Sequence, residues 1–301
     1  MSKVKVIVTG GCGFIGSTLV DELVNGGYEV VVIDDLSGES NEQFYYNNKA
    51  TYFEKDIADY NRTKHLYKDV EVVYHLAAEA RIQPTMNNPL LAAKKNTLGT
   101  CCVLQCAHEA GVKRVVYSST SAAYGLKNSI PQREDMIEDC LNPYSVSKVA
   151  GEKFCKMYTN LFDLETVIFR YFNVYGERQP VRGQYAPVIS IFLRQNKNNE
   201  SLTIVGDGSN KRDFVHVRDI ARGNILAGNL DNKKPIGHVI NLGTGKGYSI
   251  RDIANMISKN QTQLPLRKGE VEDSVADNTK ARKLLNWSPT FNFEDWIKNN
   301  S

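Results

Sequence analysis

The chain has 301 residues and a mass of 33.7 kDa, enough for one large or two modest domains at about 150 residues per domain. Its 42% hydrophobic and 24% charged residues are typical of globular proteins and exclude disorder, collagen-like repeats and coiled coil. The formal net charge of +3 is too small to favour nucleic acid or an anionic membrane as the main partner.

No apolar run reaches the ~20 residues of a membrane span. A strand-like pattern starts at Val4 and leaves no length for a signal peptide. The six cysteines contain no C-x-x-C pair, so neither a disulfide framework nor a metal site is expected. We therefore expect a cytoplasmic protein with free cysteines and no membrane or nucleic-acid partner.

Short runs rich in Val, Ile and Tyr recur through the first half of the chain, and helical patterns lie between them. The runs predict buried strands at 4–10, 29–35, 51–56, 71–78, 114–120 and 166–172. The helical patterns cover 15–25, 59–68, 89–110 and 143–162. Strands separated by helices imply right-handed βαβ units. The sequence thus predicts an α/β fold, with a Rossmann-type, doubly wound parallel sheet covered on both faces.

From about residue 175 the pattern becomes less regular and is punctuated by Gly, Asn and Asp. We predict a nucleotide-binding domain over 1–172 and a smaller α/β domain over 173–301. The run at 238–243 looks like one more buried strand that returns to the main sheet.

The segment TGGCGFIGS at 9–17 joins the first strand to the first helix and contains G-x-G-x-x-G. Glycines there allow a tight turn and a close approach of the backbone to a pyrophosphate at the helix N-terminus. Asp34 ends the second strand, where an acid binds the adenosine ribose hydroxyls. Asp34 would repel a 2′-phosphate, and the following DLSGES has no Arg or Lys, so NAD is favoured over NADP. Asp56 could contact adenine, or could instead cap a helix.

Tyr144 and Lys148 are four residues apart in PYSVSK, so a helix places them on one face. We expect the Lys148 ammonium to lower the pKa of Tyr144 toward neutrality, so that Tyr144 acts as a base. Thr120 ends a strand that should lie beside the nicotinamide, and its hydroxyl could bond the reacting oxygen. A capping role for Thr120 is the alternative.

These segments together resemble the extended short-chain dehydrogenase/reductases, and among them the NAD-dependent sugar-nucleotide epimerases typified by UDP-galactose 4-epimerase. The resemblance runs from Val4 to about Asn286 and includes TGGCGFIG, VVIDDL, HLAA, STSAAYG, PYSVSK, FRYFNVYG and SVADNTKARKLLNW. It implies that NAD is contacted by Gly10, Gly13, Phe14, Ile15, Gly16, Asp34, Asp35, Asp56, Ile57, Leu76, Ala77, Ala78, Asn96, Tyr144, Lys148 and Tyr171.

The resemblance also implies a reaction without net redox change. Tyr144 would remove the proton from the sugar 4-hydroxyl while hydride leaves C4, and hydride would return to the other face of the 4-keto sugar. Asn173, Arg212 and Arg267 match positions that contact the diphosphate of the substrate. The planar guanidinium suits this task because it makes bidentate, charge-assisted bonds to phosphate oxygens.

Sister reactions differ in the residues that follow the catalytic Thr. Related dehydratases and decarboxylases place carboxylic acids there, and 3,5-epimerising relatives place a Cys. This chain has Ser121 and Ala122, which leaves simple 4-epimerisation. A net 4-keto-sugar reductase and a non-catalytic NAD-binding protein are the alternatives from other classes.

The hexose is set by other positions. Ser274 stands where the resemblance places a size gate, and a small residue there resembles forms that admit UDP-GlcNAc and UDP-GalNAc as well as UDP-Glc and UDP-Gal. We expect Arg81, Gln83 and Thr85 to face the sugar. Arg81 could instead recognise a uronate carboxylate, which keeps a UDP-glucuronate 4-epimerase as the nearest competitor.

The resemblance further implies a homodimer in which two long helices of each subunit, here 89–110 and 143–162, form a four-helix bundle. Their apolar residues could supply the contact or could face the sheet instead. These residues are Leu90, Leu91, Val103, Leu104, Val149, Phe154 and Met157.

Overall fold

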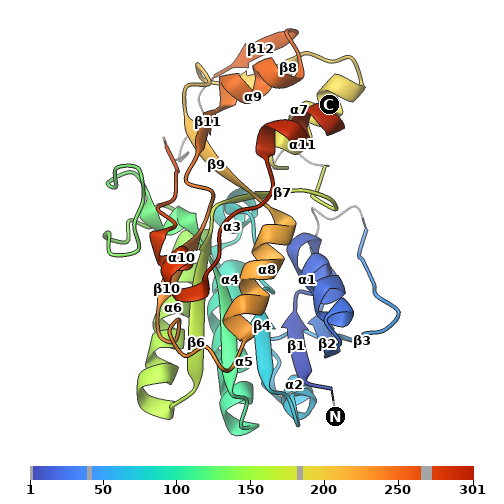
Figure 1. Ribbon diagram of the computed structural model, residues 1–301, viewed down its shortest axis with the longest axis vertical. Helices are drawn as coiled ribbons and strands as arrows, with labels where there is room; N and C mark the ends of the chain where they lie inside the picture. Colours follow the sequence, from blue (N-terminus) through green and yellow to red (C-terminus); the bar gives the residue numbers. More distant parts are fainter. Residues whose placement is uncertain (1–2, 39–42, 182–185, 266–272) are drawn as a thin grey trace.

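The computed structural model describes residues 3–38, 43–181, 186–265 and 273–301. The larger part is a parallel sheet with helices on both faces, and a small lobe lies beyond the carboxyl ends of the strands (Figure 1). We use the name small lobe for β7–β9, β11, β12, α7, α9 and α11. The predicted Rossmann-type α/β fold is confirmed.

The main sheet has seven strands in the order β10-β6-β5-β4-β1-β2-β3, and every neighbouring pair is parallel. The strands are β1 (Lys5–Thr9), β2 (Glu29–Asp34), β3 (Thr51–Glu54), β4 (Val72–His75), β5 (Arg114–Thr120), β6 (Glu165–Tyr171) and β10 (Val239–Leu242). The strand expected at 238–243 is β10, which pairs with β6. The strand order reverses between β1 and β4, and such switch points open a crevice for ligands at the carboxyl ends.

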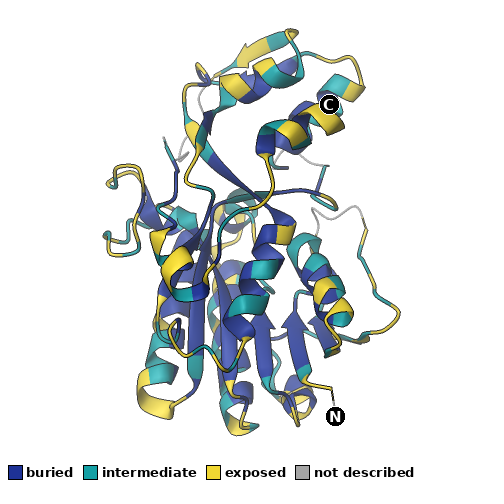
Figure 2. Cartoon of the chain, in the orientation of Figure 1, coloured by how far each residue is buried: buried dark blue, intermediate teal, exposed yellow. Residues whose placement is uncertain are grey.

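Successive residues of the strands point to opposite faces, so each strand feeds two cores. On β1, Val6 and Val8 pack with α1 (Phe14–Asn25), α8 (Val217–Gly228) and α10 (Thr279–Leu285). Ile7 packs on the other face with η1 (Lys64–Tyr67), α5 (Gly99–Glu109) and α6 (Pro143–Phe162). The sheet is accordingly the most buried part of the chain (Figure 2). This burial on both faces explains why Val and Ile are frequent in the strands.

Helices occur in every segment where the pattern predicted them, but two are divided. The region expected as one helix at 59–68 is a short α2 followed by the 3₁₀ turn η1. The region at 89–110 contains α4, the π-helical turn η2 and α5. The helices around the sheet are α1 (Phe14–Asn25), α2 (Tyr60–Thr63), η1 (Lys64–Tyr67), α3 (Ile82–Asn87), α4 (Pro89–Ala92), η2 (Ala93–Leu98), α5 (Gly99–Glu109), η3 (Ser121–Tyr124), α6 (Pro143–Phe162), α8 (Val217–Gly228) and α10 (Thr279–Leu285).

The start of α6 fixes the position of the Tyr-Lys pair. Asn142 accepts a hydrogen bond from the backbone N–H of Ser145, and the Ser145 hydroxyl interacts in turn with the N–H of Asn142. Pro143 occupies the first turn, where its missing N–H costs nothing. The helix ends at Phe162, and the following Asp163 adopts φ 54°. Local sequence therefore sets both ends of the helix.

The small lobe has its own apolar cluster around Phe192, Phe214 and Phe293. Its elements are β7 (Asn173–Tyr175), α7 (Val188–Lys197), β8 (Leu202–Val205), β9 (Lys211–His216), β11 (Gly247–Ser249), α9 (Ile250–Ile257), β12 (Gln261–Leu264) and α11 (Phe293–Asn300). They form a three-stranded sheet, a two-stranded sheet and the helices beside them. The domain boundary at residue 172 stays a prediction.

The cysteines at 12, 101, 102, 106, 140 and 155 are all free. Within the described ranges, no helix combines the length and apolarity needed to cross a bilayer. Of the residues expected at a subunit contact, Val103, Leu104 and Val149 are buried in this chain, and Val103 and Leu104 belong to the apolar cluster against the sheet.

Candidate active site

A cavity of about 890 Å³ lies at the carboxyl edge of the sheet and extends to the small lobe. Its lining comes from the segments that follow β1, β2, β4 and β5, and from α6, β6, β7 and β9. The topology thus brings distant parts of the sequence to one crevice, as expected at a switch point of the strand order.

The glycine loop between β1 and α1 has no room for side chains. A Cβ on Gly16 would lie 2.1 Å from the carbonyl oxygen of Gly10. Gly10 itself adopts φ +71°, and a Cβ there would lie 2.7 Å from the backbone nitrogen of Ala77. The first turn of α1 has no acidic residue and no side-chain cap, so its backbone N–H groups are available to an anion. The loop fits a pyrophosphate.

Asp34 is fixed where β2 ends. Its carboxylate accepts hydrogen bonds at 2.9 Å from the backbone N–H groups of Cys12 and Leu36. Burial raises the pKa of Asp34 above its ordinary value, although these two bonds oppose the shift. The bond to Cys12 joins Asp34, the acid predicted to bind the ribose, to the glycine loop.

Lys95 is a cation at this end of the cavity that sequence reasoning missed. It extends from η2, forms an ion pair with Asp35, and donates a hydrogen bond of 2.7 Å to Ser37. Burial raises the pKa of Asp35, but the bonds from Lys95 and Ser37 outweigh it, so the pKa falls below its ordinary value. The local segment DLSGES offered no sign of this contact, because Lys95 is distant in sequence.

Most residues expected to bind the cofactor line the cavity together. They are Gly10, Gly13, Phe14, Ile15, Gly16, Asp34, Asp35, Ile57, Leu76, Ala77, Ala78, Tyr144, Lys148 and Tyr171. Asp56 lies beside the lining, where it accepts a bond from the N–H of Ala58 and pairs with Lys94 at 3.2 Å.

Asn96, which was predicted to contact NAD, is not among the described residues that line the cavity. It is fully buried, and its side chain accepts a bond of 2.7 Å from the N–H of Glu79 and donates one of 3.0 Å to the Glu79 carbonyl. It also donates to the Ser147 hydroxyl at 2.9 Å. Asn96 therefore joins the segment after β4 to helix α6.

Tyr144 lies in the cavity and is hydrogen-bonded to Thr120. The Thr120 hydroxyl accepts a bond of 3.1 Å from the N–H of Ala122, which leaves its own proton for Tyr144. Burial raises the pKa of Tyr144, while the Thr120 bond and the charge of Arg81 lower it less strongly. The expectation that Lys148 brings this pKa toward neutrality is wrong here, because burial dominates and Lys148 is not among the groups that lower it.

Lys148 points toward the sheet. Its Nζ lies 4.4 Å from the ring centroid of Tyr117, whose hydroxyl donates to the Lys148 carbonyl. Burial lowers the pKa of Lys148 to about 7, although Cys155 and Glu152 favour its charged form. The ammonium is consequently sensitive to its neighbours near neutral pH.

The far end of the cavity is lined by Asn173, Arg212 and Ser274. Arg212 and Ser274 face each other across a parallel bridge, and Asn173 donates a bond of 2.9 Å to the Asp213 carbonyl. Arg267, expected to contact the diphosphate, lies outside the described residues.

The segment after β4 contributes Glu79, Arg81 and Gln83 to the cavity. Burial lowers the pKa of Arg81, whereas the charges of Tyr144 and Glu79 raise it. Thr85 does not face the sugar side as expected, because it is fully buried and its hydroxyl donates to the Ile82 carbonyl at 2.7 Å. Glu79 is a carboxylate in the cavity that sequence reasoning missed, because it considered acids only in the segment that follows Thr120.

A parallel switch-point sheet, an uncapped glycine loop, an Asp at the end of β2 and a Tyr-Lys-Thr set define an NAD-dependent enzyme of the extended short-chain dehydrogenase/reductase type. The family model described as "NAD dependent epimerase/dehydratase family" matches residues 6–243. The chain belongs to this family, and its cofactor is NAD.

Three similar proteins illustrate the range of the family. A putative UDP-glucose 4-epimerase of Methanocaldococcus jannaschii is 37% identical, with 98% of this chain and 99% of that protein covered. A UDP-glucuronate 4-epimerase of Thermodesulfobacterium geofontis is 31% identical, with 97% and 93% covered. The solved UDP-N-acetylglucosamine 4-epimerase of Methanobrevibacter ruminantium M1, in complex with UDP-N-acetylmuramic acid, has a TM-score of 0.91 and 32% identity, with 100% and 97% covered.

The predicted resemblance to NAD-dependent sugar-nucleotide epimerases is thereby confirmed, and with it the prediction of an isomerase. The three names differ in the hexose, so likeness alone does not select the sugar.

Proposed function

We propose that this enzyme interconverts the C4 epimers of a UDP-hexose and accepts both UDP-GlcNAc/UDP-GalNAc and UDP-Glc/UDP-Gal. The observation that carries the proposal is the placement of Thr120 and Tyr144 in one cavity with the glycine loop, while Arg212 and Ser274 line its other end. One end then suits NAD and the other a nucleotide sugar.

The chemistry assigned to this chain's residues is proton transfer at the sugar 4-oxygen. Bound NAD, held by the glycine loop and Asp34, would supply a reversible hydride acceptor for C4. Tyr144 takes the proton of the 4-hydroxyl as a phenolate, the form that the Thr120 bond and the charge of Arg81 favour against burial, and Thr120 holds that oxygen and the phenolic oxygen together. Lys148, one helical turn from Tyr144, supplies positive charge to the same cavity. The residues that follow Thr120 are Ser121 and Ala122, so this segment has no acid to protonate a leaving hydroxyl.

Ser274 supports the acceptance of N-acetylated sugars. It lines the cavity, is 6% exposed, and its hydroxyl lies 3.4 Å from the side-chain oxygen of Gln132. A tyrosine here would extend into the cavity, whereas serine leaves that volume to the 2-substituent of the sugar. The proposal follows from this difference in side-chain volume.

UDP-glucuronate is the second candidate substrate, and Arg81 is the observation that favours it. Arg81 is a cation in the cavity whose charge acts on Tyr144, so it can reach groups near the reacting carbon. A guanidinium binds carboxylate in a bidentate manner. The negative charge of Glu79 also acts on Arg81 and partly neutralises it, so Arg81 favours an acidic sugar less strongly.

The test is proton NMR of the anomeric signals during incubation with UDP-GlcNAc, UDP-Glc or UDP-glucuronate, each in a separate tube with NAD present. We expect the 4-epimer in the first two tubes, and Tyr144→Phe should abolish it while NAD binding persists. Product from UDP-glucuronate alone would establish the second candidate. A methyl doublet of a 4-keto-6-deoxy sugar would instead indicate a dehydratase that uses Glu79.

We also propose a homodimer through helices α4–α6. The described surface of these helices exposes Leu90 (83%), Leu98 (49%), Val146 (54%) and Leu161 (70%). Light scattering after gel filtration should give about 67 kDa, twice the 33.7 kDa chain mass, and Leu90→Glu with Leu161→Glu should shift it to the monomer.

A further inference from the structure

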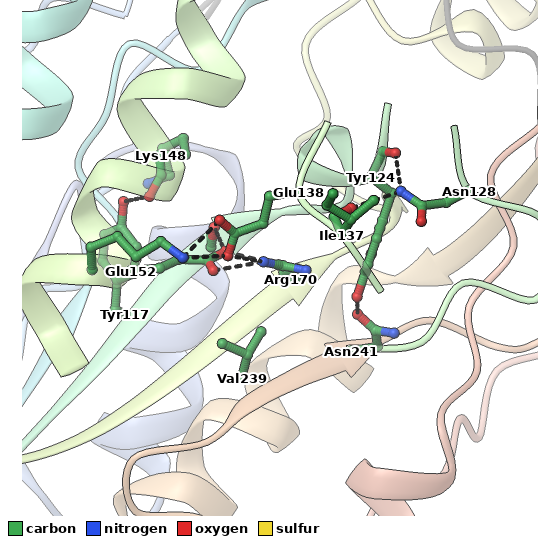
Figure 3. Close-up of polar contacts among 12 residues, drawn as sticks. Tyr117, Tyr124, Asn128, Ile137, Glu138, Lys148, Glu152, Arg170, Val239 and Asn241 are labelled. Carbon is green, nitrogen blue, oxygen red and sulfur yellow. Dashed lines mark hydrogen bonds and ion pairs between the residues drawn. The ribbon is translucent and has the colours of Figure 1, made fainter. Parts of the chain in front are cut away.

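A buried ion pair lies directly behind the catalytic helix. The Glu152 carboxylate accepts hydrogen bonds from Arg170 Nε at 2.9 Å and from Arg170 Nη2 at 2.8 Å. Glu152 is fully buried and Arg170 is 1% exposed. Figure 3 shows Arg170 of β6 pointing at Glu152, with Glu138 beside them. The sequence motifs gave no function to this pair.

The pair reaches the proposed catalytic residues along two routes. Glu152 follows Lys148 by one helical turn on the buried face of α6, and residues four apart on a helix are neighbours. The same carboxylate accepts a bond of 2.5 Å from the hydroxyl of Ser119, the residue before Thr120. Glu152 thus belongs to the helix of Tyr144 and accepts a bond from the strand of Thr120.

The charge of Glu152 is kept by its partners. Two bonds from Arg170 stabilise the carboxylate in a dry environment, and the guanidinium also stacks over the Tyr124 ring, 4.8 Å from its centroid. Breaking a buried pair by removing one member leaves an uncompensated charge. A nearby carboxylate favours the protonated form of a lysine.

Other titratable groups face Lys148 from three elements: Tyr117 on β5, His75 on β4 and Cys155 on α6. Burial raises the pKa of Tyr117 and of Cys155 far above neutrality and lowers that of His75 well below it. All three are therefore uncharged at pH 7. Among the described groups that act on Lys148, Glu152 is the anion.

We propose that Glu152 and Arg170 are positioning residues of the epimerase: the carboxylate keeps Lys148 as an ammonium ion and fixes the strand that carries Thr120. The inference rests on the proposed roles of Tyr144, Lys148 and Thr120. It assigns a catalytic purpose to a buried charge pair that packing alone would not require, since apolar side chains can replace such pairs without loss of stability.

The test is Glu152→Gln in the NAD-loaded enzyme. Removal of the anion should lower the pKa of Lys148 by about one unit, and with it the alkaline limb of the kcat profile. Because the ammonium exists below this pKa, turnover at pH 7 should fall about fivefold and recover toward acid pH. The ¹³Cε signal of Lys148, assigned with Lys148→Met, gives a readout independent of turnover.

Glu138→Gln is the matched control. Glu138 contacts the same Arg170 at 3.3 Å and pairs with Lys153, but it is not among the groups that act on Lys148. It should leave both the limb and the ¹³Cε titration in place. An equal loss of turnover at all pH values in Glu152→Gln, with an unmoved Lys148 titration, would overturn the inference.

Should Glu152→Gln not fold, Glu152→Asp retains the charge but withdraws it from Lys148. A smaller shift in the same direction supports the inference, and an unchanged limb and titration overturn it. Full activity of Lys148→Met would refute the proposed catalytic roles themselves. If Lys148→Met is inactive and the Lys148 titration stays fixed in the Glu152 variants, only the positioning role is refuted.

Discussion

Gly16→Ala tests whether the glycine loop binds the cofactor. The new Cβ would lie 2.1 Å from the Gly10 carbonyl oxygen and 2.8 Å from the Gly11 Cα. Carbon atoms in contact prefer separations near 3.5 Å, so α1 and the loop must separate by about 1 Å or more. Gly10 is hemmed in by the backbone of Ala77, so it cannot withdraw without displacing that segment.

The displacement moves the N–H groups of the first turn of α1 away from a bound pyrophosphate. A hydrogen bond to a charged group contributes about 1.5–3 kcal/mol, so each bond lost weakens NAD binding by about 10- to 100-fold. The assay is a titration with NADH followed by its fluorescence, on protein freed of nucleotide.

Gly26→Ala at the other end of α1 is the control, because its φ of −73° is ordinary and its nearest Cβ contact would be 3.3 Å. Circular dichroism checks that both variants are folded. An affinity of Gly16→Ala within about threefold of the wild type would refute the argument that this loop cradles the dinucleotide.

Three further predictions concern the sugar, the reaction and the fold. Tyr144→Phe should lower kcat at least about 100-fold with NADH affinity unchanged; near-normal turnover by NMR would contradict its role as base. Ser274→Tyr should lower kcat/KM for UDP-GlcNAc about tenfold or more and spare UDP-Glc; an equal effect on both sugars would remove the size-gate argument. Arg114 is fully buried and donates to Glu165 and to the carbonyls of Ala227 and Asn229. Arg114→Met should therefore lower the free energy of unfolding, measured in urea, by about 3–5 kcal/mol. An unchanged urea midpoint of unfolding would show that these bonds do not stabilise the fold.

The elements of this protein that depend on local sequence could be predicted. The strands β1, β4 and β10 are mainly apolar runs because both of their faces are buried, whereas the strand β3 is only partly covered. Helix α6 starts at Pro143 because Asn142 and Ser145 cap it. The glycine loop was recognisable because only residues without a Cβ fit there, and that restriction is visible in the residue types themselves.

Electrostatic properties of the site could not be predicted in this way. The pairing of Tyr144 with Lys148 suggested a lowered tyrosine pKa, yet the depth of burial reverses the direction. The depth at which Tyr144 is buried depends on how α6 packs against the sheet, and the spacing of residues along one helix does not reveal it. The prediction that Thr85 faces the sugar was wrong for the same reason. Its hydroxyl donates to the Ile82 carbonyl within its own helix, and no pattern in the sequence indicates this burial.

The sequence by itself determined the fold class, the cofactor and the Tyr-Lys-Thr set, because each depends on residue types at fixed short spacings. Only the tertiary structure brought Lys95 to Asp35, Glu79 and Arg81 to Tyr144, and Arg170 to Glu152. These partners come from separate segments of the chain, and the packing of those segments sets their distances. A charge acts through space on its nearest neighbours, so its effect is decided by the fold rather than by position along the chain.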